Sequence, residues 1–380
     1  MTNRSRFIAL GTIVVIALVL TLVLRDSWML GGDSLGKYSG TGHVDWSLSF
    51  EGDRLAYRVC DGEKGPCTIA IYDFEADKVV SYRNDTGARW GTPTFSMDSK
   101  LLAFPVEEPG TDNWHIAIMT VEGKDYRVVT KGTGIRTAPS FSPDGRKLTY
   151  QCAGYLSESY YTPYKGNTRR QREREICVLD HAKGIEKRIT KLDSYSYSRP
   201  KFLSDSEHVL IQFDERYTDP DTGNTAHRES MAVIKIDTLQ STKVMTEQPL
   251  AISTRVAPLA HRVTFSMVTN EMDANDPDLH EVDGVRVYGY NYDLFLWEGS
   301  DDIQKTKGSI RRLTKGRSYM SGYDFSANGN KIAYAFDVGH NGIMKFFLMD
   351  INDGQVQEFR LPEKIDAWID TQPQKKIGDQ

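Results

Sequence analysis

The feature that most constrains this chain is a β-hairpin signal that occurs six times between residues 44 and 334. Its clearest copy is residues 137–150, in which Ser-Pro-Asp-Gly separates two short apolar segments. Proline presets φ and glycine accepts a positive φ, so this tetrapeptide favours a tight turn. The weaker copies are residues 44–57, 92–104, 199–211, 257–265 and 323–334.

Each hairpin is followed by two further short apolar segments, which predict the third and fourth strands of a repeated unit. After residues 137–150 these segments are 176–180 (Ile-Cys-Val-Leu-Asp) and 187–190 (Lys-Arg-Ile-Thr). Short strands at regular spacing indicate a closed all-β array, and a repeat of about 40–45 residues is typical of a propeller blade. We therefore predict an all-β fold, a six-bladed β-propeller of four-stranded blades, preceded by one N-terminal transmembrane helix.

The hairpin resembles the one that opens each blade in TolB-like β-propellers, Pro-x-(Trp/Phe)-Ser-Pro-Asp-Gly-x-x-(Leu/Ile)-(Ala/Thr)-(Tyr/Phe). Phe141-Ser-Pro-Asp-Gly145 matches closely, and the copy at 257–265 lacks the turn tetrapeptide. The resemblance covers roughly residues 42–360 and does not include the small α/β domain that precedes the propeller in TolB. It implies a propeller fold and a capacity to bind proteins, and it names no partner.

The N-terminus predicts membrane attachment. Residues 7–24 carry no charge, and 18 residues lie within the roughly 17–25 that cross a bilayer as a helix. Arg4 and Arg6 precede this segment, and positive flanks stay in the cytoplasm. A cleaved signal peptide is the alternative, but the span exceeds the roughly 7–15 residues of a signal core and no small-x-small cleavage site follows it.

These observations predict five segments in chain order. Residues 1–6 are a cytoplasmic N-terminus, 7–24 a transmembrane signal anchor, 25–42 a flexible linker, 43–360 the propeller and 361–380 a polar C-terminal tail. We expect a single-pass protein of the bacterial inner membrane, with its N-terminus inside and its propeller in the periplasm.

The four cysteines occur as two pairs at the same station of two repeats. This arrangement predicts the disulfides Cys60–Cys67 and Cys152–Cys177, which persist outside the cytosol. The alternative is four buried thiols. The spacing does not favour a metal site, and a formal net charge of −5 argues against a nucleic-acid partner. We expect no cofactor.

The long insertions all lie between the second and third strands of three consecutive units, at residues 153–175, 214–230 and 268–292. Antiparallel strands alternate in direction, so these connections open on one face of the predicted disc, which we call the crown face. Long loops are often functional, and Tyr and Arg are enriched at interface hot spots. The predicted contact residues are Tyr160, Tyr161, Tyr164, Arg170, Arg172 and Tyr217 on the crown face, with Tyr195, Tyr197 and Tyr319 at the mouth of the central funnel.

The sequence thus predicts a non-catalytic protein–protein interaction module or accessory subunit of a cell-envelope assembly. The alternatives are a propeller that binds a small ligand or glycan in its central funnel, and a lyase-type propeller enzyme with histidine ligands around a metal. The eight histidines fall at unrelated stations of the repeats. Gly32-Asp-Ser-Leu-Gly36 matches a hydrolase nucleophile elbow but lacks the strand and helix that the elbow needs, so we assign no catalytic residue.

Overall fold

The computed structural model of the chain divides into two compact units, Met1–Lys37 and Tyr38–Gln380. All residues whose placement it describes belong to the second unit. They are residues 46–60, 67–83, 88–111, 113–153, 175–190, 197–218, 223, 225–244, 251–257, 262–268, 280–282, 285–287, 292–299, 308–314, 319–337, 344–359 and 375–376.

The regular structure of the described residues is entirely β, in runs of four antiparallel strands that pair in chain order. The first run, the β1–β4 group, consists of β1 (Trp46–Leu48), β2 (Arg54–Cys60), β3 (Cys67–Asp73) and β4 (Lys78–Arg83). The next groups are β5 (Thr94–Phe95), β6 (Leu101–Glu107), β7 (Trp114–Thr120) and β8 (Arg127–Val128), then β9 (Ile135–Phe141), β10 (Lys147–Ala153), β11 (Glu175–Asp180) and β12 (Ile185–Arg188).

The second half of the unit repeats this order. The β13–β16 group consists of β13 (Tyr197–Phe202), β14 (His208–Thr218), β15 (Thr225–Lys235) and β16 (Ser241–Val244). The β17–β22 group consists of β17 (Ala251–Ala257), β18 (Arg262–Val268), β21 (Tyr292–Gly299) and β22 (Gly308–Arg312), with a separate hairpin of β19 (His280–Val282) and β20 (Val285–Val287) between β18 and β21. The β23–β26 group consists of β23 (Tyr319–Phe325), β24 (Lys331–Asp337), β25 (Met344–Asp350) and β26 (Val356–Phe359).

Strand pairing differs from the six separate blades expected from the sequence. Among the described strands, the β1–β4, β13–β16, β17–β22 and β23–β26 groups form four separate sheets, whereas β5–β12 form one eight-stranded sheet. The eight-stranded sheet results from a single parallel pair, Trp114 with Ile135, which joins β7 to β9. The strand β8 is two residues long and pairs with β7 outside this path. The β1–β4 sheet gains a fifth strand, β27 (Lys375–Lys376), which pairs in parallel with β4. The β-propeller architecture is confirmed, whereas the described strands do not form the six separate four-stranded blades that the sequence predicts.

The predicted turns are present between the first and second strands of five groups, and residues 258–261, between β17 and β18, lie outside the described residues. In the clearest copy, Ser142 Oγ donates to Asp144 Oδ1 at 2.6 Å and accepts the Lys147 N–H at 2.9 Å. The residue after this acid has a positive φ, as the turn requires. It recurs at the equivalent position as Gly52 (69°), Ser99 (55°), Gly145 (70°), Ser206 (58°) and Gly329 (74°).

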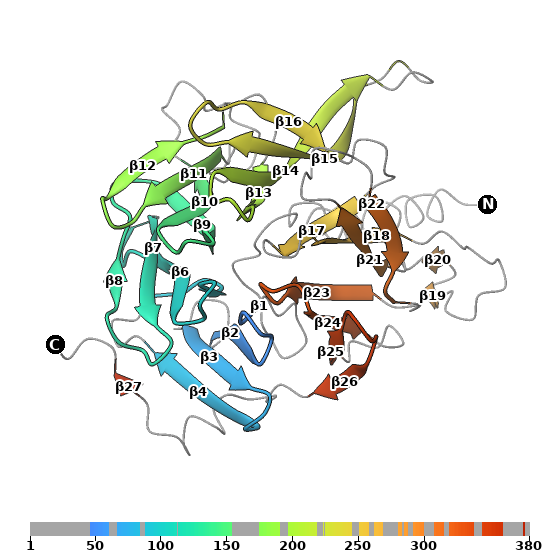
Figure 1. Ribbon diagram of the computed structural model, residues 1–380, viewed down its shortest axis with the longest axis horizontal. Coiled ribbons are helices and arrows are strands. Elements are labelled where there is room, and N and C mark those ends of the chain that lie inside the picture. The colour runs from blue at the N-terminus through green and yellow to red at the C-terminus, as the bar shows by residue number, and fades with distance from the viewer. Residues whose placement is uncertain are drawn as a thin grey trace, which may run out of the picture. The chain divides into compact units, whose positions relative to one another are not determined.

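The core lies between the groups. Among the described residues, six hydrophobic clusters each join two neighbouring groups, and the order closes on itself because one cluster packs the β23–β26 group against the β1–β4 group. Trp90, Phe104 and Ile69 are fully buried in the cluster between the β1–β4 and β5–β8 groups. Within residues 38–380 the groups therefore follow one another in chain order around a centre (Figure 1).

No helix in the described part of the chain is long and apolar enough to cross a membrane. The predicted span at 7–24 and the linker at 25–42 lie outside the described residues, as does most of the C-terminal tail.

Candidate functional site

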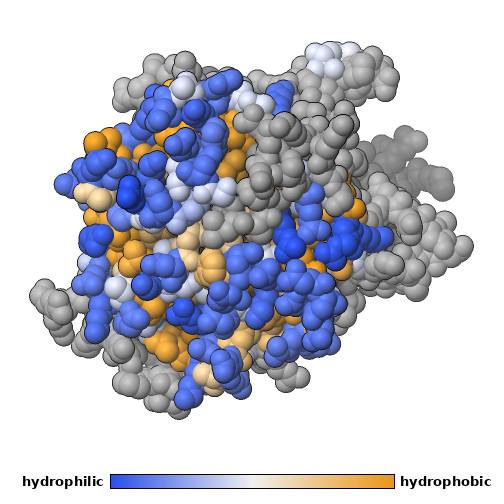
Figure 2. Space-filling view, in the orientation of Figure 1, coloured by the Kyte–Doolittle hydropathy of each residue, from blue (hydrophilic) through white to orange (hydrophobic). Residues whose placement is uncertain are grey.

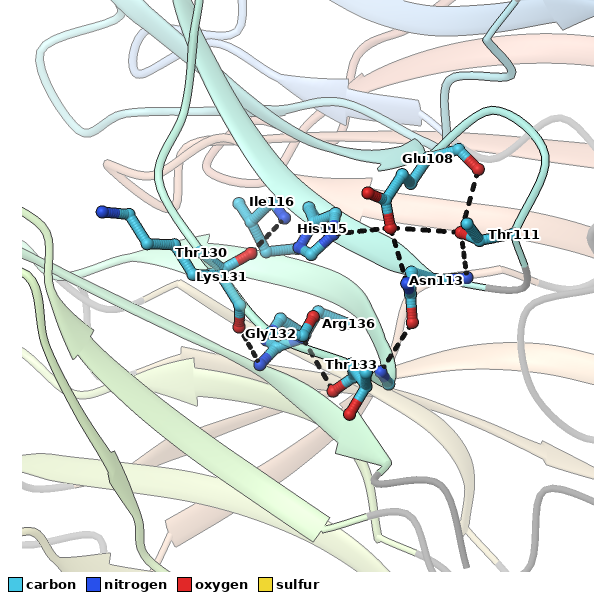
Figure 3. Close-up of polar contacts among 11 residues, drawn as sticks. Glu108, Thr111, Asn113, His115, Ile116, Thr130, Lys131, Gly132, Thr133 and Arg136 are labelled. Atoms are coloured by element: carbon cyan, nitrogen blue, oxygen red, sulfur yellow. Dashed lines mark hydrogen bonds and ion pairs between the residues drawn. The ribbon is translucent and has the colours of Figure 1, made fainter.

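The crown face is built from strand ends and the links that leave them. In the β5–β8 group, the amide of Asn113 connects two of these links (Figure 3). Its Nδ2 donates to Glu108 Oε2 at 2.5 Å, and its Oδ1 accepts the Gly134 N–H at 3.0 Å. Hydrogen bonds from Asn113 and Thr111 hold the pKa of Glu108 below its usual range. The connection between β6 and β7 is thus held against the link between β8 and β9.

Arg136, in β9, contacts the link between β8 and β9 and a carboxylate in β12. Its guanidinium donates to the backbone carbonyls of Lys131 at 2.6 Å and of Gly132 and Thr133 at 3.5 Å. Its Nε lies 3.4 Å from Glu186 Oε1, which also accepts the hydroxyl proton of Tyr150 at 2.8 Å. Burial, and then the nearby Glu186 carboxylate, raise the pKa of Tyr150, so its hydroxyl remains a donor. The link between β8 and β9 is therefore held by hydrogen bonds to the guanidinium of Arg136, which is 9% exposed.

A buried carboxylate marks the point where the 154–174 insertion returns to the sheet. Glu175, the first residue of β11, is 3% exposed. Its Oε2 accepts the hydroxyl proton of Thr190 at 3.2 Å and lies 3.4 Å from Arg188 Nε. The Thr190 hydroxyl in turn accepts the Ile176 N–H at 2.9 Å. We call this arrangement of acid, threonine and arginine a carboxylate bracket.

The same bracket recurs where the insertion after β18 returns to the sheet. Asp293 in β21 is fully buried. Its Oδ1 accepts the hydroxyl proton of Thr314 at 2.9 Å, and Oδ2 forms an ion pair with Arg312. The Thr314 hydroxyl accepts the Leu294 N–H at 2.9 Å. Two long insertions in different groups thus each rejoin the sheet at a carboxylate bracket of the same composition.

The β5–β8 group shows what the bracket looks like without a long insertion. Thr130 Oγ1 accepts the Ile116 N–H at 2.9 Å, as Thr190 and Thr314 do in their groups (Figure 3). His115 holds the place of the acid, and the connection before it is short. In these three groups, the buried carboxylate accompanies the long insertion.

A disulfide reinforces the base of the 154–174 insertion. Cys152 in β10 and Cys177 in β11 are bonded, with their Cα atoms 5.8 Å apart, which confirms this predicted pair. Cys67 is also disulfide-bonded, and the strand register places it opposite Cys60. The side chain of Cys60 lies outside the described residues, so the Cys60–Cys67 bond stays a prediction.

Most of the predicted contact residues lie outside the described part of the chain. These are Tyr160, Tyr161, Tyr164, Arg170, Arg172 and Tyr195. For Tyr197, Tyr217 and Tyr319 only the backbone is described. Tyr197 and Tyr319 begin β13 and β23, the first strands of their groups, and Tyr217 pairs with Ala226 within the β14–β15 hairpin. Residues 214–230, expected to be an insertion, largely continue these two strands.

Three histidines whose side chains are described are held by neighbours within the protein. His115 Nε2 lies 3.7 Å from Glu108, His208 Nδ1 lies 2.6 Å from Asp205, and His181 Nε2 lies 2.8 Å from the Gly145 carbonyl oxygen. The described residues contain no group of three or more His, Cys, Asp or Glu side chains arranged to hold a metal ion.

The described surface offers scattered rather than contiguous apolar area. Figure 2 shows apolar residues as small separate areas among hydrophilic ones on the face in view. The exposed large apolar side chains lie one to a strand on outer strands of the groups: Val80, Val128, Ile185, Ile310 and Val356. Single exposed aliphatic residues are normal on soluble proteins. The described surface therefore presents polar side chains and connections rather than a contiguous apolar patch.

No family model matches the sequence, and no curated protein sequence matches it. Among solved structures, TolB from Acinetobacter baumannii is similar with a TM-score of 0.53 and 16% identity, over 82% of this chain but only 64% of that one. An oligogalacturonate lyase in complex with manganese gives 0.52 and 14%, over 83% and 77% of the two chains.

The β-propeller domain of the Trilobed protease from Pyrococcus furiosus, described as having an open velcro topology, is also similar. Its TM-score is 0.50 at 13% identity, over 85% of this chain and 96% of that one. Likeness at such identities shows the fold alone, and it confirms a β-propeller arrangement of the kind found in TolB. TolB, a lyase and the propeller domain of a protease share it, so the fold does not select an activity.

Proposed function

We propose that this chain is a membrane-anchored, extracytoplasmic propeller that acts without catalysis as a protein–protein interaction module, an accessory subunit of a cell-envelope assembly. The TolB-like hairpins and the structural likeness to TolB support the kind of role. The uncharged span at 7–24 with its arginine flank supports a location in the bacterial inner membrane with the propeller in the periplasm. The Cys152–Cys177 disulfide supports an oxidising compartment.

We count six blades in this propeller by treating the eight-stranded sheet as two. Two observations support the count. The β5–β8 and β9–β12 groups each keep the antiparallel order of the other groups, and a single residue pair joins them. In addition, the hydrophobic cluster of Ala103, Ile118, Phe141 and Leu148 packs these two groups face to face, as separate blades pack.

The observation that carries the binding role is the pair of carboxylate brackets. Burying a carboxylate is costly unless it is paired and hydrogen-bonded, and the Glu175 and Asp293 carboxylates are both. Each fixes the backbone where a long crown-face insertion rejoins the sheet. Binding residues commonly lie on connections positioned by a rigid scaffold, which is the arrangement that these brackets create.

In-membrane photo-crosslinking tests the role. Tyr160 and Tyr164 lie in the insertion predicted for the crown face, so a photoreactive residue at either position tests that prediction. A photoreactive residue at Glu75, in the turn between β3 and β4, samples the opposite face of the disc. We expect the crown positions to yield a defined protein adduct identified by mass spectrometry, and Glu75 not to yield it. Absence of any protein adduct from the crown positions would contradict the proposal.

The manganese-bound lyase with the same fold makes metal content the second test. Purified protein that retains a stoichiometric divalent metal would favour a lyase-type enzyme over the interaction module. A thermal shift with oligosaccharides in the absence of bound metal would favour a glycan binder. We expect neither.

A further inference from the structure

The first strand of every group carries a polar residue at one equivalent position, opposite the third residue of the second strand. In the first three groups this residue bears a hydroxyl, and in the last three it is charged. The six residues are Ser47, Thr94, Ser140, Lys201, Arg255 and Asp324. The groups follow one another around a centre with their first strands innermost (Figure 1), so these positions form a ring, which we call the polar ring.

Two charged members of the ring meet although they start on distant faces. Lys201 shares a sheet face with Leu210 directly opposite it, and that face packs toward the β17–β22 group. Asp324 faces the β1–β4 group, where it accepts the Leu48 N–H. Burial raises the pKa of Asp324, and the Lys201 charge is close enough to offset part of this rise. Two sheets stand between these faces, so the side chains are neighbours only along the inner edges of β17 and β23.

Arg255 reaches the same place from the strand between them. Its guanidinium lies 5.4 Å from the ring centroid of Tyr323, and its Nε lies 3.7 Å from Asp324 Oδ1. The side chains of Arg255 and Asp324 are 15% and 10% exposed, and Lys201 is half-buried. Two cations and one acid from three neighbouring groups therefore share a partly buried place at the inner edge of the sheets.

The charges of this place specify what would bind. Lys201 and Arg255 outnumber the single acid of the ring, and the hydroxyl members add no charge. Among the described residues, none forms an ion pair or hydrogen bond with the Lys201 ammonium. A charge held away from water is costly unless it is paired, so the site suits one further negative charge. A carboxylate supplies one charge and matches the planar guanidinium of Arg255.

We propose that the charged half of the polar ring binds a carboxylate group, held between the Lys201 ammonium and the Arg255 guanidinium at the centre of the propeller. Asp324 positions Arg255 and limits the excess charge of the site to one. The carboxylate belongs either to a free small molecule or to an acidic side chain of a partner protein, and its recognition is the same in both cases. The inference goes beyond the proposed function, because it needs no contact on the crown face.

Thermal unfolding of the full-length protein in detergent tests binding, with acetate as the probe and chloride at equal ionic strength as the reference. Acetate should raise the unfolding temperature saturably, because a ligand that binds only the folded state stabilises it by mass action. Lys201→Gln should weaken the apparent affinity for acetate about tenfold, a typical loss for a hydrogen bond to a charged group. The matched control is Lys147→Gln, which removes a half-buried lysine whose Nζ donates to the Ser206 carbonyl oxygen, and it should leave the affinity unchanged.

Treatment of intact cells with a carbodiimide identifies the source of the carboxylate in the unmodified protein. The reagent activates a carboxylate, which then forms an amide with a lysine amine in contact with it. Mass spectrometry of the Lys201 peptide should show a small fixed mass increase for a free carboxylate, or a link to an acidic residue of one other protein. The proposal would be overturned by an acetate effect that does not saturate, by equal affinities in the two lysine variants, or by coupling of Lys201 to Asp324 alone. Crown-face cross-linking, which tests the proposed function, decides none of these outcomes.

Discussion

The backbone N–H of Leu48 donates a hydrogen bond to Asp324 Oδ2 at 3.2 Å, across 276 positions of the chain. This bond joins β1 to β23, the inner strands of the first and last groups. The next junction repeats it with a neutral acceptor, because Ser47 Oγ accepts the Phe95 N–H at 3.3 Å. Among the described strands, none of the β1–β4 or β23–β26 strands is exchanged between the two groups. Side-chain contacts, and the hydrogen bond that the Asn328 N–H donates to the Phe50 carbonyl oxygen at 3.2 Å, hold this junction instead.

Replacing Asp324 with Leu should therefore destabilise the fold. The change leaves the buried Leu48 N–H without its acceptor. It also removes one partner of Arg255, whose Nε lies 3.7 Å from Asp324 Oδ1. Loss of a buried hydrogen-bond partner costs about 1–3 kcal/mol. Urea unfolding should show a loss of this size. Ser47→Ala removes the neutral acceptor of Phe95 and one hydrogen bond to Asp324, but leaves the Leu48 acceptor in place, so it should cost less. Equal losses in the two variants would contradict this prediction.

Stability should depend on pH through the same carboxyl group. Burial raises the pKa of Asp324, and Lys201 and the Leu48 N–H offset only part of this effect. The folded state therefore keeps the Asp324 proton to a higher pH than the unfolded chain, whose aspartates titrate at about 3.9. The folded state binds more protons between these two pKa values, so stability falls as pH rises through that window.

The non-titrating variant Asp324→Asn isolates this effect. The free energy of unfolding of the wild type minus that of the variant should decrease as pH rises from about 4 through the raised pKa, and then level off. Urea unfolding at a series of pH values measures this difference. A difference that increases with pH would show that ion pairing with Arg255, rather than burial, governs Asp324.

Gly52 and Gly145 allow a matched test of the junction. Both have a positive φ, 69° and 70°, at the equivalent place in their turns. A Cβ on Gly52 would lie 2.9 Å from Cβ of Lys331 in the last group, whereas a Cβ on Gly145 would meet nothing within 4 Å. Gly145→Ala should cost about 1–2 kcal/mol from the left-handed backbone, and Gly52→Ala should cost measurably more in thermal unfolding. The same loss of stability in both variants would mean that the contact between residue 52 and Lys331 relaxes at little cost.

At Asp144, the acid of the turn, substitution by Asn should reduce stability less than substitution by Ala. Burial alone would raise its pKa, but hydrogen bonds from Ser142 and the Arg146 N–H lower it. Asn328 makes the same contacts in the β23–β26 group, accepting from Ser326 at 2.8 Å. We expect Asp144→Ala to cost about 1 kcal/mol in urea unfolding and Asp144→Asn to cost less. The stabilisation from the carboxylate should be present above the ordinary Asp pKa and lost as pH falls through the lowered one.

The Cys152–Cys177 bond closes a sequence separation of 25 residues. Replacing both cysteines with alanine should cost about 3 kcal/mol in the chain-entropy account, because the unfolded chain regains that loop freedom. The predicted Cys60–Cys67 bond closes a much shorter loop, so the corresponding double variant should cost less, about 2 kcal/mol. Thermal unfolding with and without reductant provides the control, since reductant should affect the wild type and spare a variant that lacks both pairs.

Much of the fold could be predicted because its signals are local. The turn positions have positive φ even where glycine is replaced, as at Ser99 and Ser206, and the cysteine stations located the Cys152–Cys177 bond correctly. Residues 214–218 and 225–229 were not predicted as strand, because they show no alternation of apolar and polar residues, yet they extend β14 and β15. The brackets were also missed, although Arg-Ile-Thr at 188–190 and Arg-Leu-Thr at 312–314 repeat in the fourth segments.

The sequence by itself determined the repeated hairpin, its turns and its apolar strands, because each depends on residues a few positions apart. Only the tertiary structure decided that Asp324 accepts the Leu48 N–H and that β7 pairs with β9. It also decided that Glu175 and Asp293 are buried carboxylates at equivalent places in their groups. These relationships depend on where separate sheets bring their side chains together. The residues that form a turn are neighbours in the sequence, so the turn can be predicted from them. The partner of a buried charge depends on how separate strand groups pack together, which the sequence order does not specify.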